Sequence, residues 1–197
     1  SGLPEDARAL ARRNIDALHG GAYDAIVSNS AGCGAMLKEY GELLADDPTY
    51  ATVAQRFAAQ VRDITEFLAS IELNRQMGAV DAVVTYQDAC HLAHGQRIRS
   101  APRKLLAAIP GIALEEMASA DICCGSAGSY NIVQNEMSLQ ILAHKMEAVN
   151  RTRATIVATA NPGCELQLKA GVRLHGNRQR VMHVVELLDL AYRNYTK

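Results

Sequence analysis

The chain has 197 residues, of which 49% are hydrophobic, and its 20 basic residues nearly balance its 21 acidic ones. This length is enough for one large domain or two small ones with an ordinary buried core. The balanced charge argues against a nucleic-acid-binding face, no apolar run reaches the ~18 residues of a membrane span, and the N-terminus lacks the features of a signal peptide. We therefore expect a cytoplasmic protein that binds no nucleic acid.

The first part of the chain predicts helices around one short strand. Apolar residues recur at helical spacing over residues 5–18. A strand is expected over 23–28, a helix over 33–44 and a long amphipathic helix over about 50–71. The apolar stripe of this last helix indicates core packing or a subunit contact. Its members are Val53, Phe57, Val61, Ile64 and Leu68.

The rest of the chain alternates strands and helices. Strands are predicted over 82–86, 112–116, 155–159 and 181–183, and helices from about Pro102, over 129–149, over 163–171 and over 184–194. Strands separated by helices are typical of parallel β-α-β units with helices on both faces of the sheet. The fold class predicted for the chain is therefore α/β.

An internal repeat divides the chain. Residues 25–33 resemble residues 155–164 with one gap, and residues 61–68 resemble residues 181–188. Each copy predicts a strand, a Gly-Cys turn, a helix, a strand and a helix, and two matches in the same order favour duplication. We expect one pseudo-repeat over 1–76, which lacks its first part, and a complete one over 77–197.

Four of the five cysteines are predicted to share one metal site. Cys90 and Cys164 follow predicted strands, and Cys123 and Cys124 precede a long helix. The carboxyl ends of parallel strands meet at one edge of a sheet, where ligands bind. Helix N-termini at the same edge favour the thiolate form, which binds metals. The alternative is that the cysteines are small buried apolar residues.

The cysteine spacing leaves two kinds of metal open. Four thiolates fit either a zinc ion or an iron–sulfur cluster. Structural zinc sites usually contain short Cys-x2–4-Cys pairs, which are missing here, and adjacent cysteines suit a larger cluster better. We expect Gly125, Gly128 and Gly163 to allow tight turns and close approach of the backbone to such a cofactor.

Three polar residues near Cys90 are further candidates. His91 and His94 are spaced to share a helical face, and both are expected to lie around the metal ligands, with direct ligation as the alternative. Asp88 is expected either to orient the loop by accepting backbone N–H bonds or to cap a helix.

Three motifs resemble one known family. They are Asp-Ala-Cys-His-Leu at 88–92, Cys-Cys-Gly-Ser-Ala-Gly at 123–128 and Asn-Pro-Gly-Cys at 161–164. Together they resemble the CCG (cysteine-rich) domain, which occurs in tandem in heterodisulfide reductases, lactate-utilisation proteins and the glycolate oxidase iron–sulfur subunit. Residues 30–41 and 88–96 resemble the last of these most closely. The motifs also place Asn161 at the site.

The resemblance implies a function and partners. It implies a [4Fe–4S]-type cluster in an enzyme that oxidises glycolate, with a flavin-binding partner subunit through which the chain could lie at the inner membrane. The isolated chain is not expected to be catalytic. Two alternatives remain open: a thiol–disulfide redox domain like heterodisulfide reductase, and a structural zinc module that mediates subunit contacts.

The chain departs from the family pattern at two points. Gln167 stands where the fullest family motif ends in a second cysteine, which favours one cluster with four thiolates. The ferredoxin-like part and the start of the first repeat are not in this sequence, so the chain is expected to be the C-terminal piece of a longer protein. Cys33 is then an orphan, predicted to bind no metal and to lie well away from Cys90.

Overall fold

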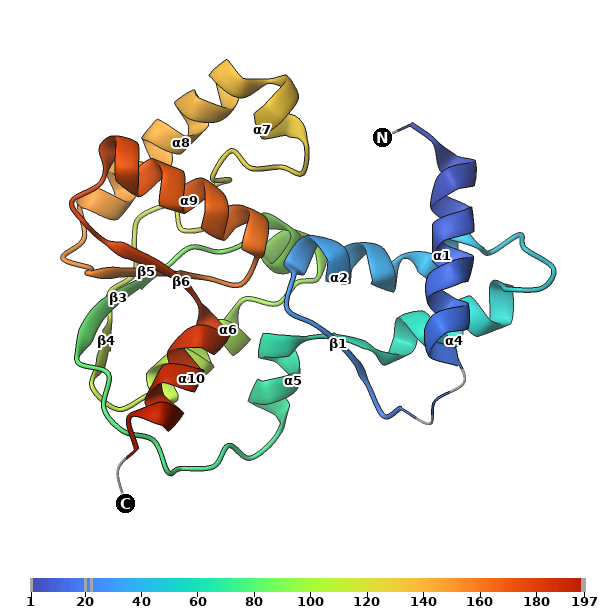
Figure 1. Cartoon of the computed structure of the whole chain (residues 1–197), viewed down its shortest axis with the longest axis horizontal. Helices are drawn as coiled ribbons and strands as arrows, with labels where there is room; N and C mark the ends of the chain where they lie inside the picture. The colour runs from blue at the N-terminus through green and yellow to red at the C-terminus, as the bar shows by residue number, and fades with distance from the viewer. Residues whose placement is uncertain (1, 20, 22, 196–197) are drawn as a thin grey trace.

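The fold is built on two parallel β-sheets, each covered by helices (Figure 1). The computed structural model describes residues 2–19, 21 and 23–195. The smaller sheet pairs β1 (Ile26–Ser28) with β2 (Val61–Asp63). The larger sheet has the strand order β4-β3-β5-β6. Both sheets are parallel, which confirms the predicted α/β class.

The larger sheet is covered on both faces. Its strands are β3 (Ala82–Tyr86), β4 (Ile112–Leu114), β5 (Ile156–Thr159) and β6 (Arg180–His183). Helices α8 (Asn135–Asn150) and α9 (Pro162–His175) cover one face, and α6 (Ser100–Ala108) and α10 (Val184–Arg193) cover the other (Figure 1). Successive side chains of β5 point to opposite faces of the sheet and so contribute to the apolar cores on both faces. Val157 packs under α8 and α9, whereas Ile156 and Ala158 pack under α6 and α10.

The smaller sheet carries its own apolar core. Its helices are α1 (Pro4–His19), α2 (Ala31–Lys38), α3 (Tyr40–Leu43), α4 (Ala51–Gln60) and α5 (Ile64–Ser70). The rings of Tyr40 and Phe57 stack with centroids 5.6 Å apart. Ile15 of α1 and Val61 of β2 are buried in the same cluster. This core holds α1 and α4 against the start of β2.

The predicted helix over 50–71 is wrong, because β2 interrupts it. Val61 pairs with Ile26 of β1, and Asp63 accepts the Thr65 N–H at 2.8 Å as the first residue of a capping box that starts α5. Sheet pairing therefore overrides the apolar stripe. The internal repeat, in contrast, predicts a strand at this position. β1, α2, β2 and α5 follow the same order as β5, α9, β6 and α10.

Two other predicted helices are each divided in the structure. The helix expected over 33–44 begins at Ala31 and is broken at Glu39, and the helix over 129–149 is divided at Gln134 into α7 (Tyr130–Val133) and α8. Gln134 has φ −127° and ψ 51°, outside the helical region. The division of the chain at residue 76 stays a prediction.

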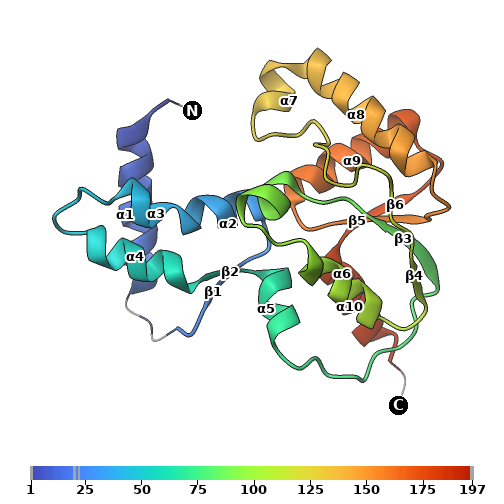
Figure 2. The same cartoon turned by 180° about the vertical axis from the view of Figure 1, so that it is seen from behind.

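The smaller sheet with α1–α5 forms one unit, and the larger sheet with its helices forms the other. The two units are in contact at the carboxyl ends of their strands. The Nε2 of His183, at the start of α10, lies 3.0 Å from the Asn29 carbonyl after β1. Gln96 donates to the Ala31 carbonyl at 2.9 Å, next to the π-helical turn His91–Gly95. Figure 2 shows α5 between the smaller sheet and helices α6 and α10. No helix in the described part of the chain is both long enough and apolar enough to cross a membrane.

Candidate metal centre

All five cysteines line one cavity at the carboxyl edge of the strands. The cavity has a volume of about 370 Å³. The loops after β3, β4 and β5 contribute four cysteines, and the start of α2 contributes the fifth. Its lining consists of Ser30, Gly32, Cys33, Cys90, His91, Cys123, Cys124, Ser126, Ala127, Gly128, Asn161, Gly163 and Cys164. The topology therefore brings residues that are distant in the sequence to one cavity. Ser30 and Asn161, for example, are 131 positions apart.

The sulfurs of four cysteines form a continuous row. Cys90 hydrogen-bonds to Cys123, Cys123 to Cys124, and Cys124 to Cys164. These bonds lower the pKa of Cys123 and Cys164, which accept, and raise the pKa of Cys90 and Cys124, which donate. The hydrogen bonds therefore favour the thiolate form at Cys123 and Cys164, and the thiolate is the form that binds metals.

Nitrogen donors surround the row. The Gly125 N–H donates to the Cys123 Sγ at 3.3 Å, and the Ser126 N–H hydrogen-bonds to Cys124. The Asn161 Nδ2 donates to the Cys164 Sγ at 3.4 Å. The His91 Nδ1 lies 3.5 Å from the Cys90 Sγ. Such N–H···S bonds stabilise thiolates and tune metal-bound sulfur.

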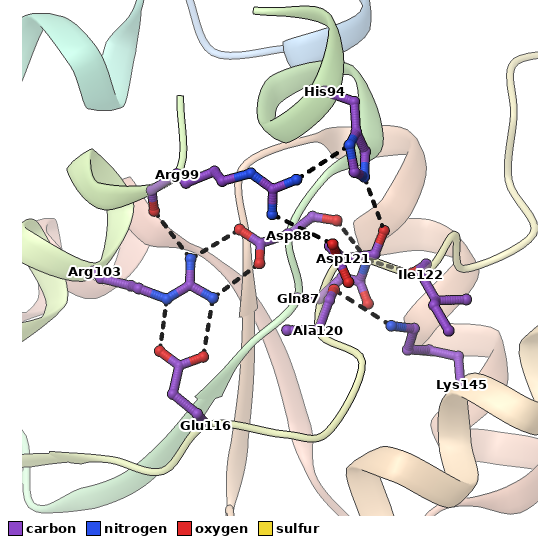
Figure 3. A network of polar contacts seen from close by, with 10 residues as sticks. All are labelled: Gln87, Asp88, His94, Arg99, Arg103, Glu116, Ala120, Asp121, Ile122 and Lys145. Atoms are coloured by element: carbon purple, nitrogen blue, oxygen red, sulfur yellow. Dashed lines mark hydrogen bonds and ion pairs between the residues drawn. The ribbon is translucent and has the colours of Figure 1, made fainter. Parts of the chain in front are cut away.

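Two predicted candidates differ in their placement. His91 lines the cavity, whereas His94 is held outside it. The Arg99 guanidinium lies 3.1 Å from the Nδ1 of His94, whose Nε2 lies 3.4 Å from the Asp121 carbonyl (Figure 3). The expected shared helical face does not form, because residues 91–95 adopt a π-helical turn.

Cys33 lies closer to the other cysteines than predicted. It follows the carboxyl end of β1, and its side chain is exposed, but it lines the same cavity as Cys90. The expected separation from Cys90 is therefore wrong. The Oδ1 of Asn161 accepts the Gly32 N–H at 3.2 Å and the Ser30 hydroxyl at 3.3 Å, which docks the start of α2 beside the cavity. That Cys33 binds no metal stays a prediction.

Gly125 is required by packing rather than by the cavity alone. Its φ is +92°, and an added Cβ would lie 2.5 Å from the Ser138 carbonyl oxygen. Gly128 also has a positive φ of +63°, with open space where a Cβ would be. An added Cβ on Gly163 would lie 3.1 Å from the Ser126 hydroxyl. Gly125 and Gly128 therefore allow sharp turns beside the sulfurs, whereas the turn expected at Gly163 is wrong, because Gly163 lies in α9 and its φ is not positive.

Asp88 pairs with an arginine that the sequence did not indicate. Its carboxylate, 5% exposed, accepts two hydrogen bonds from Arg103 at 2.8 Å each, and Arg103 also binds both oxygens of Glu116 (Figure 3). The Arg103 guanidinium lies 5.0 Å from the centre of the Tyr86 ring. Neither role expected for the Asp88 carboxylate is seen. Only its backbone N–H binds the other loop, by donating to the Ala120 carbonyl at 3.1 Å.

Two more side chains connect the cysteine loops. Gln87, fully buried, donates to the Asp88 and Ile122 carbonyls at 2.6 and 3.2 Å. Lys145 of α8, 2% exposed, donates to the Ser119 carbonyl at 2.7 Å. A sequence signal for Lys145 existed, because it lies between Leu142 and Val149 on the buried face of its helix.

The arrangement of sulfurs bears on which metal fits. Within residues 2–19, 21 and 23–195, no three His, Cys, Asp or Glu side chains are grouped around a point where one ion would bind. Cys90, Cys123, Cys124 and Cys164 instead line one cavity of about 370 Å³. A single zinc ion needs four ligands at about 2.3 Å from one centre, whereas a cluster presents several irons at different positions. The four thiols therefore supply the ligand set that an iron–sulfur cluster requires.

The chain matches one protein family and is similar to several known proteins, two of which are named as subunits of redox enzymes. The model of the family described as "Cysteine-rich domain" matches residues 1–38 and 84–169, more than half of the chain. The probable glycolate oxidase iron-sulfur subunit of Bacillus subtilis is 43% identical over 192 residues, and a subunit of the fumarate reductase (CoM/CoB) of Methanothermobacter marburgensis is 38% identical over 184. Lactate utilization protein A of Bacillus licheniformis is 29% identical over 190 residues.

The coverage of these relatives is unequal. The aligned residues make up 95%, 93% and 96% of this chain, in the same order, but 43%, 35% and 79% of the relatives. The chain thus spans less than half the length of the glycolate oxidase and fumarate reductase relatives. The names give no support to the zinc alternative.

Proposed function

The chain belongs to the cysteine-rich (CCG) domain family, and we propose that it holds one iron–sulfur cluster and passes electrons within an enzyme that oxidises glycolate. The proposed ligands are Cys90, Cys123, Cys124 and Cys164. The observation that carries the proposal is that these four cysteines, from three different strand–helix connections, line one cavity at the sheet edge. An iron–sulfur role agrees with the name of the Bacillus subtilis relative, an iron-sulfur subunit.

The cluster is proposed to be of the [4Fe–4S] type. Gln167, at the position of a further family cysteine, donates to the Ser138 hydroxyl at 2.9 Å, and its side-chain oxygen accepts a bond from Asn131 at 3.3 Å. It is 7% exposed and is not among the residues that line the cavity. Four thiolates match the usual ligand set of such a cluster.

The bound cluster would supply reversible one-electron transfer, and the protein would supply its environment. The N–H donors of Gly125, Ser126 and Asn161 stabilise negative charge on the sulfurs. Cys124 and Cys164, 1% and 5% exposed, are shielded from water, whereas Cys90 and Cys123 are partly exposed. Electrons would therefore enter or leave on the side of Cys90 and Cys123.

Partner subunits are proposed because two relatives are named as subunits of larger enzymes. A flavin-binding subunit would oxidise the hydroxy acid, and a ferredoxin-like part of a longer protein would accept or donate electrons at this site. The assembly is proposed to be cytoplasmic and to reach the inner membrane through its partners. Glycolate is the proposed substrate because the relative of highest identity named above is a probable glycolate oxidase subunit.

One observation favours a second candidate function. The exposed Cys33 thiol lines the same cavity as the four-sulfur row. A free thiol beside a cluster suits thiol–disulfide redox chemistry, in which a disulfide accepts two electrons and two protons to give two thiols. Trapping of Cys33 in a mixed disulfide, with loss of that species in Cys33→Ser, would support this alternative.

The spectrum of the anaerobically purified chain tests the leading proposal. An iron–sulfur protein is brown, absorbs in the visible range and bleaches on reduction with dithionite, and its iron and acid-labile sulfide can be measured chemically. A colourless chain that contains zinc, or no metal after anaerobic reconstitution with iron and sulfide, would contradict the proposal.

A further inference from the structure

Lys145 is a buried cation beside the loop that carries two cysteines. It lies on α8 among Leu142, Met146 and Val149, which are fully buried. Its side chain reaches the loop before Cys123, where the Nζ donates to the Ser119 carbonyl at 2.7 Å. The Nζ also lies 3.4 Å from the Ala120 carbonyl (Figure 3). A helical position on the core face would ordinarily hold an apolar side chain.

The acidic side chains around Lys145 have other partners. The carboxylate of Asp121 pairs with Arg99 at 3.4 Å, and that of Asp88 pairs with Arg103 at 2.8 Å. The ion pairs found among residues 2–19, 21 and 23–195 include none with Lys145. A buried charge without a counter-charge is costly to the folded state. Two carbonyl dipoles compensate only part of such a cost.

The remaining negative charge near Lys145 is that of the cysteine row. The Ser119 and Ala120 carbonyls that contact the Lys145 Nζ belong to the loop that leads into Cys123 and Cys124, and both of these cysteines line the cavity. Burial lowers the pKa of Lys145, and Cys124 is the first of the negative groups that oppose this effect. The ammonium is therefore held on the loop that carries two of the four proposed ligands.

We infer that Lys145 is the fixed positive counter-charge of the cysteine-held cluster and that it raises the cluster's reduction potential. The inference deepens the proposed function and depends on it. Reduction adds an electron to the cluster, and a positive charge in a surrounding of low dielectric stabilises the reduced form over the oxidised form. The hydrogen bond to Ser119 explains how the ammonium is held in place, but a neutral donor could serve that purpose as well.

Charge and hydrogen bonding can be separated at this position. Lys145→Gln keeps an N–H donor for the carbonyls and removes the charge, whereas Lys145→Arg keeps the charge. Lys104→Met is the matched control, because the Lys104 Nζ also donates to a backbone carbonyl, that of Ala69 at 2.7 Å, but its side chain is exposed and outside the cysteine cavity. The readout is the midpoint potential of the iron-loaded chain in a spectroscopic redox titration.

The inference predicts a lower midpoint potential for Lys145→Gln alone. At a fixed applied potential, its ratio of reduced to oxidised cluster should fall about tenfold, which is about 59 mV for a one-electron couple. The midpoint potentials of Lys145→Arg and Lys104→Met should differ from that of the wild type by only a small fraction of that shift. An unchanged potential in Lys145→Gln would overturn the inference while leaving the proposed function intact.

Loss of the cluster in a variant would also be decisive. If Lys145→Gln fails to retain iron while Lys145→Arg retains it, and both iron-free proteins have the same circular dichroism and melting temperature, the charge is needed to hold the cluster, as inferred. If Lys145→Arg loses iron too, or if the iron-free Lys145→Gln protein is unfolded, the lysine has a structural role and the inference is wrong. A wild-type chain without iron would refute the proposed function itself, and the inference with it.

Discussion

The Nδ2 of Asn161 lies 3.4 Å from the Sγ of Cys164, and the two residues stand on either side of the start of α9. The Oδ1 of the same side chain accepts the Gly32 N–H of α2 at 3.2 Å. One amide therefore connects the smaller unit to a proposed cluster ligand. This connection explains why the first Gly-Cys turn lies beside the cavity.

Asn161→Asp should weaken iron binding without unfolding the chain. The new carboxylate keeps an acceptor for Gly32 but replaces the N–H donor with an oxygen that repels the Cys164 sulfur. Residues that orient metal ligands typically contribute about 10- to 100-fold in metal affinity. Iron transfer to a chelator should therefore be at least about tenfold faster. Asn135→Asp is the control, because Asn135 is exposed and bonds to the Asn131 carbonyl rather than to a sulfur.

Arg103→Met should destabilise the fold strongly. The substitution removes the bidentate hydrogen bonds to the buried Asp88 carboxylate. It also removes the guanidinium group that lies 5.0 Å from the centre of the Tyr86 ring. The expected loss in free energy of unfolding is about 3 kcal/mol, measured by urea denaturation. Arg153→Met should cost less than about 1 kcal/mol, because the Arg153 side chain is 86% exposed in its pair with Glu115. Equal losses in the two variants would contradict this account.

Asp63→Asn should make stability less dependent on pH. Burial raises the pKa of Asp63 above its ordinary value of 3.8, so the folded protein holds this proton more tightly than the unfolded chain. The protonated Asp63 carboxyl group therefore makes its full contribution to the free energy of unfolding at pH values below 3.8. This contribution is lost as the pH rises through the pKa that Asp63 has in the folded protein. Asparagine keeps the cap on Thr65 and stays neutral.

The comparison with wild type gives the sign of this effect. The free energies of unfolding of both proteins should be measured from about pH 4 to about pH 7. The stability of Asp63→Asn should increase relative to that of the wild type as the pH rises. Asp46→Asn, at an exposed position, should not show this gain. A difference between Asp63→Asn and wild type that stays constant, or falls with rising pH, would show that Asp63 carries no such linkage.

The sequence predicted the cysteine site better than its surroundings. Cys90, Cys123, Cys124 and Cys164 could be placed together because parallel strands end at one edge and each cysteine follows a strand or precedes a helix. Arg103 could not be predicted as the partner of Asp88, because 15 residues and a π-helical turn separate them. Such a pairing depends on how helices pack, which local patterns do not record.

The interrupted helix shows the same limit at the level of the fold. Residues 50–71 carry a helical stripe, yet Val61 pairs with Ile26, which lies 35 positions earlier in the chain. Only the repeat with residues 181–188 pointed to a strand there. For the secondary structure of residues 61–63, the internal repeat was thus more informative than the helical periodicity of apolar residues. The position of Cys33 was missed because the contact of Asn161 with Gly32 joins two units across 129 residues.

The isolated chain should not oxidise glycolate. Its sequence contains no glycine motif for a dinucleotide and no ferredoxin-type cysteine run, so hydride or electron removal from a hydroxy acid would need a partner. Assays with glycolate and an artificial acceptor should show no turnover above a buffer control. Addition of a flavin-binding partner subunit should be required for activity. Turnover by the purified chain alone would refute this division of labour.

The iron and acid-labile sulfide content of single Cys→Ser variants tests the central claim most directly. The wild-type chain should bind about four irons and four sulfides, as one [4Fe–4S] cluster requires. Substitution of Cys90, Cys123, Cys124 or Cys164 should remove most of both, whereas Cys33→Ser should keep them. Wild-type content in all four variants would refute the proposed site, and a loss in Cys33→Ser equal to that in Cys164→Ser would show that Cys33 is a ligand of the same cluster.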